Sequence, residues 1–116
     1  MQAERTRIEL NEAMAAMFDE VDLVITATNP HTAFDAEGRL PDDFGGKSAK
    51  PINNGALTIP SNIYGNPAIS IPIGNGSDGL PVGLQVLAAH HREPVLLELA
   101  HQVERGRPWP LVAPGR

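Results

Sequence analysis

Residues 65–87 read GNPAISIPIGNGSDGLPVGLQVL, which is the clearest structural pattern in the chain. Isoleucine stands at every second position from 69 to 73, and apolar side chains stand at every second position from 82 to 86. This period-two alternation is typical of half-buried strands. Between the two runs, Asn75–Gly79 contains the turn-forming dipeptides Asn-Gly and Asp-Gly. The stretch therefore predicts an antiparallel hairpin. Pro72 has no N–H to donate, so we expect it at a sheet edge or facing away from a partner.

A helix, a strand and a second helix are predicted around this hairpin. The apolar spacing from Leu10 to Phe18 predicts an amphipathic helix over residues 5–19. The run Val21–Thr26 is apolar on both of its faces, which predicts a central strand buried on both sides. Pro94 stands at a favourable first-turn position for the last helix. The buried stripe of that helix is predicted to consist of Leu96, Leu99, Ala100 and Val103.

The segment His31–Gly55 shows no periodicity and predicts a long loop. A length of 116 residues fits one domain, so we expect residues 1–116 to form a single domain or a fragment of a larger one. The expected fold class is α/β, a mixed sheet with flanking helices that includes the hairpin. Hydrophobic residues make up 41% of the chain but aromatic residues only 4%, which predicts an aliphatic core with Trp109 at its edge.

The charge balance excludes several classes of partner. The net charge is −5, and the nine Lys and Arg residues form no dense cluster, so neither nucleic acid nor an anionic membrane is an expected partner. The chain has no cysteine and no apolar run long enough to span a membrane. The polar N-terminus does not look like a signal peptide. A cytoplasmic protein is expected.

The order of several segments resembles one known family. The hairpin core DGLPVGLQ at residues 78–85 follows TIPSNIYGNPA at residues 58–68. Before them VDLVITATNP follows the first helix, and after them comes EPVLLELAHQVERG at residues 93–106. Together these segments resemble the carboxy-terminal part of the amidase signature enzymes. That family includes general amidases and the A subunits of glutamyl-tRNA amidotransferases.

The resemblance implies a catalytic apparatus that this chain does not contain. Family members cleave amides with a Ser, a second Ser on a cis peptide and a Lys, and the serines lie in a Gly/Ser-rich signature upstream of the region matched here. No such run occurs in this sequence. We therefore expect a C-terminal fragment of an amidase-signature hydrolase, inactive alone, with no catalytic residue, metal ligand or cofactor of its own. A non-catalytic module or split subunit that docks on another chain is the alternative.

Four short patterns in the chain admit a functional interpretation, and each has a simpler one. Gly45–Ser48 looks like part of a phosphate loop but lacks the required upstream Gly. Ser48 and Lys50 are a Ser–Lys pair without a second Ser or an oxyanion cradle. His90–His91 would point to opposite sides of a strand. Asp42–Asp43 lies in a solvated acidic loop. None is expected to be catalytic.

Substrate-binding residues are implied by the resemblance alone. The family's segment before the hairpin lines the acyl or amide pocket, which implies that Thr58, Ser61 and Asn62 bind a small-molecule amide. Asn62 has a structural alternative, a backbone hydrogen bond in a turn before Gly65. Tyr64 interrupts the segment and either narrows the pocket or packs against the core.

One departure from the family pattern bears on the substrate. In amidotransferases the A chain carries an Asp that can hold the glutamine amino group, and the matching position here is Gly55. A free ammonium group would find no charged partner there. This favours a general amidase over part of the A chain of a glutamine-dependent tRNA amidotransferase. Because Val21–Thr26 is expected to need cover from outside the chain, we also expect self-association or a catalytic partner chain.

Overall fold

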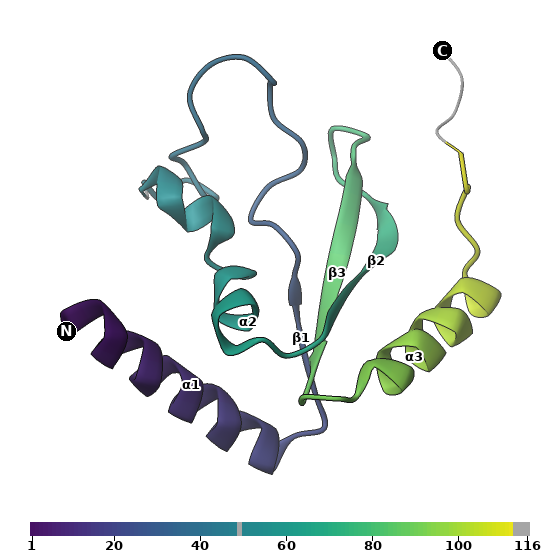
Figure 1. Ribbon diagram of the computed structural model, residues 1–116. Helices are drawn as coiled ribbons and strands as arrows, with labels where there is room; N and C mark the ends of the chain where they lie inside the picture. The colour runs from purple at the N-terminus through teal and green to yellow at the C-terminus, as the bar shows by residue number, and fades with distance from the viewer. Residues whose placement is uncertain (49, 113–116) are drawn as a thin grey trace.

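The computed structural model describes residues 1–48 and 50–112 (Figure 1). The elements in chain order are α1 (Gln2–Glu20), β1 (Leu23–Ala27), the 3₁₀ helix η1 (Pro51–Gly55), α2 (Ile59–Tyr64), β2 (Ala68–Asn75), β3 (Pro81–Ala88) and α3 (Glu93–Gly106). The strands form one antiparallel sheet in the order β1-β3-β2. In Figure 1, α1 and α2 lie on one side of the sheet and α3 on the other. The α/β class expected from the sequence is confirmed.

The predicted hairpin is present. Strands β2 and β3 pair with Ile69 opposite Val86 and Ile71 opposite Leu84. A β-bulge between Pro72 and Gly74 interrupts the register. Strand β2 is an edge strand, as the missing N–H of Pro72 requires. The turn begins one residue later than expected, because Asn75 still belongs to β2.

The predicted position of the Val21–Thr26 strand is wrong. Strand β1 lies at the edge of the sheet, and the side chain of Ile25 is 60% exposed. The central strand is β3, in which residues 85–88 are buried on both faces. Helix α3 packs on β2 and β3 and leaves the outer part of β1 uncovered. The apolar run Val21–Thr26 therefore does contain a strand, but the described residues do not bury it on both faces.

The core is aliphatic, as the composition predicts. A cluster of Ile71, Val86, Ala88 and Leu96 joins the hairpin to α3. Leu99, Ala100 and Val103 pack against this cluster from α3, and Trp109 also packs against it. The predicted stripe of the last helix is thus confirmed.

A short helix, α2, precedes the hairpin where the sequence predicted only a turn. Its boundaries have two recognisable signals: Pro60 in the first turn and Gly65 at the C-cap with a left-handed φ of 83°. Thr58 stands at the N-cap but makes no side-chain capping hydrogen bond. The Gly65 N–H closes the helix by donating to the carbonyl oxygen of Ser61 at 2.7 Å. Tyr64 packs between α1 and the β3–α3 connection, with ring centroids 6.4 Å from Phe18 and 4.3 Å from His90.

Candidate functional site

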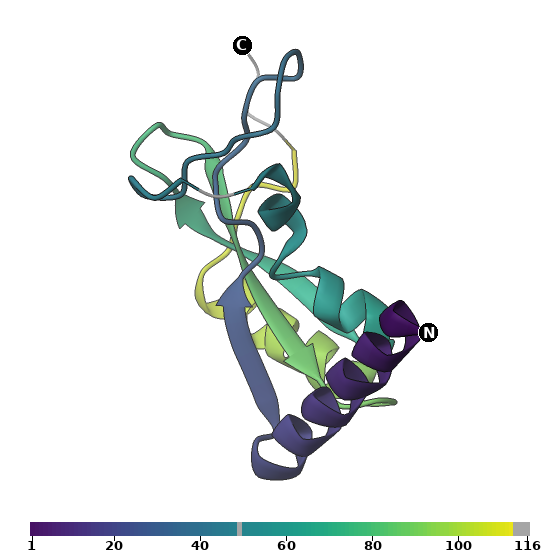
Figure 2. The same cartoon turned by 90° about the vertical axis from the view of Figure 1, so that its left-hand side faces the viewer.

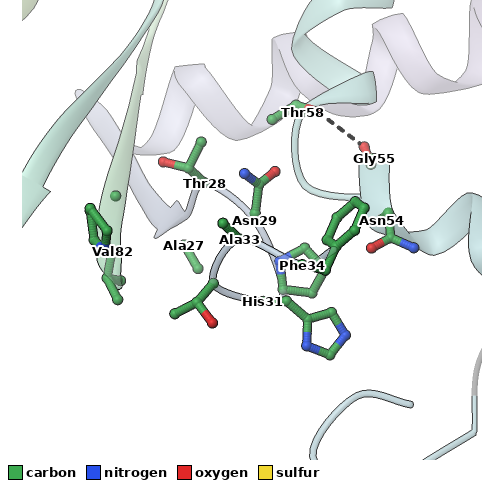
Figure 3. A pocket seen from close by; sticks show the side chains of 14 residues that line it. Ala27, Thr28, Asn29, His31, Ala33, Phe34, Asn54, Gly55, Thr58 and Val82 are labelled. Atoms are coloured by element: carbon green, nitrogen blue, oxygen red, sulfur yellow. Dashed lines mark hydrogen bonds between the residues drawn. The ribbon is translucent and has the colours of Figure 1, made fainter. Parts of the chain in front are cut away.

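A groove of about 980 Å³ lies where the end of β1, the start of β3 and the η1–α2 segment meet (Figure 3). Figure 3 shows Val82 and Thr28 on one side of it, Phe34 and Asn54 on the other, and the Asn29 side chain between them. Among the residues that the structure describes, no Asp, Glu, Lys or Arg contributes to its walls. The lining consists of Ala27, Thr28, Asn29, Pro30, His31, Thr32, Ala33, Phe34, Asn54, Gly55, Thr58, Pro81, Val82 and Gly83.

The groove residue Thr28 shares a hydrogen bond with a second hydroxyl, that of Ser70, above Gly83. Thr28 Oγ1 and Ser70 Oγ are hydrogen bonded at 2.6 Å. A Cβ on Gly83 would lie 2.6 Å from the Ser70 oxygen and 2.8 Å from the Thr28 oxygen, so only glycine leaves room for the pair. The Thr28 N–H donates to the Gly83 carbonyl oxygen at 3.0 Å, which fixes the backbone at this point. In such a pair one hydroxyl donates its proton to the other oxygen, and the proton of the second hydroxyl is available to a ligand.

The buried side chain of Gln85 links the sheet to the segment that carries Thr58. Gln85 is 4% exposed, and its Nε2 donates to Thr26 Oγ1 at 2.9 Å and to the Leu57 carbonyl oxygen at 2.8 Å. A buried amide with both of these partners is costly to displace. Gln85 therefore positions the chain immediately before α2 against the sheet.

The structure places the three predicted substrate-binding residues in different environments. Thr58 lines the groove, and its hydroxyl donates to the Gly55 carbonyl oxygen at 3.3 Å. Ser61 is 6% exposed and does not line the groove. Asn62 is exposed on α2, also outside the lining, and its backbone N–H donates to the Thr58 carbonyl oxygen at 3.3 Å. Only Thr58 thus has direct access to the groove.

Gly55, the position matched above to the Asp of the amidotransferase pattern, also lines the groove. A Cβ added there would lie 2.9 Å from Ile59 Cδ1, so a larger residue would require the isoleucine side chain to move. The isoleucine side chain thus occupies space that a side chain at position 55 would need.

The loop that follows β1 is tied to the tip of the hairpin. Thr32 Oγ1 donates to Asp78 Oδ2 at 2.5 Å, and the Leu80 N–H donates to the other carboxylate oxygen at 3.0 Å. These two hydrogen bonds lower the pKa of the Asp78 carboxyl from its usual value of 3.8. Because the folded-state pKa is the lower one, the contact stabilises the fold above about pH 4. That contribution is lost as the pH falls through the folded-state value.

Two of the other patterns noted in the sequence have local hydrogen-bond partners. The N–H of Gly46 donates to the Asp43 carboxylate at 2.8 Å, which places an acid where a phosphate loop would bind its anion. His90 Nε2 is hydrogen bonded to the Tyr64 carbonyl oxygen at 3.0 Å. Among residues 1–48 and 50–112, no three His, Cys, Asp or Glu side chains gather as a metal site requires, and no helix is long and apolar enough to cross a membrane.

Most residues that line the groove were not predicted from the sequence. Thr28, Asn29, His31 and Phe34 come from the loop after β1, and Gly83 comes from the hairpin. The available signal was the family's Thr-Pro-rich loop at this strand end. That loop is here TATNP, which contributed only to the overall resemblance. The His31 ring also packs against the Phe44 ring, tilted by 33° at a centroid distance of 4.6 Å.

The amidase family model matches residues 1–97 of the chain. The chain belongs to the amidase family. The resemblance seen in the hairpin and its flanking segments is therefore confirmed. The match includes α1, the whole sheet and every residue that lines the groove.

Relatives in the amidase family are much longer than this chain. It is 36% identical over 112 residues to the A chain of the glutamyl-tRNA(Gln) amidotransferase of Thermosynechococcus vestitus, which covers 94% of this chain and 22% of that protein. It is 54% identical over 54 residues to the 6-aminohexanoate-cyclic-dimer hydrolase of Pseudomonas sp. strain NK87, covering 47% of this chain and 11% of that enzyme. A crystal structure of a bacterial aryl acylamidase of the amidase signature family superposes with a TM-score of 0.74 at 26% identity, covering 89% of this chain and 22% of that one. The chain thus spans about a fifth of the relatives it matches over most of its length.

Proposed function

We propose that this chain forms part of the substrate-binding wall of an amidase, and that its ligand is an uncharged amide. The observation that carries the proposal is that no described Asp, Glu, Lys or Arg lines the groove. Apolar side chains from Pro30, Phe34 and Val82 suit the hydrocarbon part of such a ligand. The Thr28 hydroxyl can donate to its carbonyl group, and the Thr58 hydroxyl, whose proton goes to the Gly55 carbonyl oxygen, can accept from its N–H group. Of the three predicted binding residues, Thr58 is the one that we expect to contact the ligand.

The chain's role in this proposal is binding, not bond cleavage. Amide hydrolysis in the family proceeds through a seryl acyl-enzyme, with a Ser as nucleophile and a second Ser and a Lys relaying the proton. Those groups would come from outside this sequence, which has no Gly/Ser-rich signature. Residues 1–116 then act as one unit of an amidase body, with the groove facing the catalytic groups.

The lack of charged residues in the described lining of the groove favours an amidase over a glutamine-using amidotransferase. Glutamine carries an ammonium and a carboxylate, and both would lose water on entering a groove without a charged partner. Gly55 stands where the family can place an acid for the ammonium. The cyclic dimer named for one relative has no free ends, and such a molecule fits an uncharged groove.

Ligand titration of the isotopically labelled chain, followed by amide NMR shifts, tests this proposal. ε-Caprolactam, a neutral cyclic amide, is expected to shift the amide signals of Thr28, Gly55, Thr58 and Gly83. L-Glutamine is expected to bind at least about tenfold more weakly, a difference of about 1.4 kcal/mol. Equal or tighter binding of glutamine would contradict the proposal.

The change Gly55→Asp is expected to reverse this preference by placing a carboxylate in the wall. Its matched control is Ala56→Asp, which adds the same charge at a neighbouring residue outside the groove lining. The control should bind both ligands as the unchanged chain does. A loss of caprolactam shifts in both variants would show that net charge alone, and not its place in the groove, controls binding.

A further inference from the structure

Two segments that line the groove are attached to the sheet in different ways. Thr28 follows β1 and is fixed by its backbone, because its N–H donates to a carbonyl oxygen of β3 at 3.0 Å. Gly55 ends η1 and Thr58 stands at the N-cap of α2, a helix that packs against α1 (Figure 2). Among the described residues, no hydrogen bond except one from Gln85 joins residues 51–58 to a strand.

The Gln85 side chain lies outside the groove lining but is bonded to both segments. It stands on the central strand β3 opposite Thr26 of β1, and it is 4% exposed. Its Nε2 donates one proton to the Leu57 carbonyl oxygen at 2.8 Å and the other to Thr26 Oγ1 at 2.9 Å. A carbonyl oxygen can only accept, and the Thr26 hydroxyl gives its own proton to the Ala27 carbonyl oxygen at 3.0 Å. Both partners therefore require an N–H donor at position 85.

We propose that Gln85 is a positioning residue that sets the place of Thr58 in the groove. Leu57, to which Gln85 donates, comes immediately before Thr58. Thr26 comes two residues before Thr28, so their side chains lie on the same side of the extended chain. The Gln85 amide thus links the two segments that carry the hydroxyls expected to contact the ligand. Without this link, the segment before α2 is free to move away from the sheet.

The link matters for binding because a neutral amide presents its carbonyl and its N–H group at a fixed separation. In the proposed site Thr28 donates to the carbonyl and Thr58 accepts from the N–H group, so both hydroxyls must be in place. A groove that becomes ordered only when the ligand enters loses affinity, because binding then includes the cost of ordering. The expected loss of affinity rests on the proposed function, whereas the place of Thr58 in the free chain does not.

The change Gln85→Met tests the inference in the free chain. Methionine is unbranched and of similar length, but it has no hydrogen to donate to either partner. The backbone amide NMR signals of Gly55, Leu57 and Thr58 are expected to shift. The Thr58 N–H, which donates to the Gly55 carbonyl oxygen at 3.1 Å, is expected to exchange with solvent at least about tenfold faster. Unchanged signals and unchanged exchange at these residues would overturn the proposal.

The change Val86→Ala is the matched control for lost stability. Val86 is adjacent to Gln85, but it is 1% exposed in the cluster that contacts α3 and lies outside the groove lining. Its truncation lowers the melting temperature and leaves the Gln85 hydrogen bonds in place. At a temperature where both variants are folded, Gln85→Met is expected to bind ε-caprolactam at least about tenfold more weakly than the unchanged chain, and Val86→Ala about equally. Equal losses of affinity in the two variants would show that Gln85 acts only through overall stability, which would overturn the proposal.

Two further measurements keep the inference separate from the proposed function and from failure to fold. If the unchanged chain binds no ε-caprolactam, the proposed function fails, and the signals of Gly55 and Thr58 in the free variants still decide the role of Gln85. If Gln85→Met does not fold, the side-chain N–H protons of Gln85 in the unchanged chain decide it. They are expected to exchange at least about tenfold more slowly than those of the exposed Gln2. Exchange as fast as at Gln2 would show that the link does not form.

Discussion

The isolated chain is expected to hydrolyse no simple aliphatic or aryl amide above the buffer rate. Catalysis in this family requires a Ser, a second Ser and a Lys in one constellation, and the Gly/Ser-rich signature that carries the serines does not occur in this sequence. The Ser–Lys pair in the long loop has an exposed serine, Ser48, which pairs as an isolated bridge with Asp43. Without a positioned base, a serine hydroxyl is a weak nucleophile.

The assay uses a panel of neutral amides with the purified chain at high concentration. The variants Ser48→Ala and Lys50→Ala are the controls, because each removes one member of the Ser–Lys pair in the loop. Turnover that both variants retain would indicate a contaminating amidase. Turnover that either variant abolishes would contradict our interpretation of this loop and assign the chemistry to the chain itself.

The change Ile71→Ala is expected to destabilise the chain by about 2–5 kcal/mol. Ile71 is 2% exposed and belongs to the cluster that joins the hairpin to α3. Truncation removes buried methyl groups and leaves a cavity that a closely packed cluster fills only in part. A chain of this size has little stability to spare, so the variant is expected to be largely unfolded at room temperature.

Ile73 provides a matched control on the same strand. It lies at the β-bulge and is 42% exposed, so Ile73→Ala is expected to cost less than about 1 kcal/mol. Urea unfolding followed by circular dichroism measures both changes. Equal losses at the two positions would mean that the period-two register of β2 continues through the bulge and that both side chains are buried.

The hairpin and the last helix could be predicted from sequence because their signals are local. Alternation along Ile69–Ile73 and the stripe from Leu96 to Val103 depend only on neighbouring residues. The place of β1 could not be predicted, because burial of a strand depends on which strands flank it. Helix α2 was missed because its six residues are too few to show an amphipathic period.

The residues of the groove could be predicted only in part, because most of them come together through contacts between distant segments. Thr58 was identified through the family pattern, and it does line the groove. The Thr28–Ser70 hydroxyl pair over Gly83 combines three segments that are far apart in the sequence, so no local spacing indicates it. Gln85 looked like a polar residue on a half-buried strand. Its hydrogen bonds to Thr26 and Leu57 depend on a contact between the sheet and the segment before α2.

A chimaeric enzyme tests whether the groove is the wall of an amidase site. The stretch of the bacterial aryl acylamidase that superposes on 89% of this chain would be replaced by the chain, and a cooperative melt would establish that the chimaera folds. If the groove is the wall of an amidase site for uncharged amides, the chimaera hydrolyses neutral amides, and Gly55→Asp lowers that rate while Ala56→Asp does not. A folded chimaera that is inactive on neutral amides, or equally active with Gly55→Asp, would contradict the account.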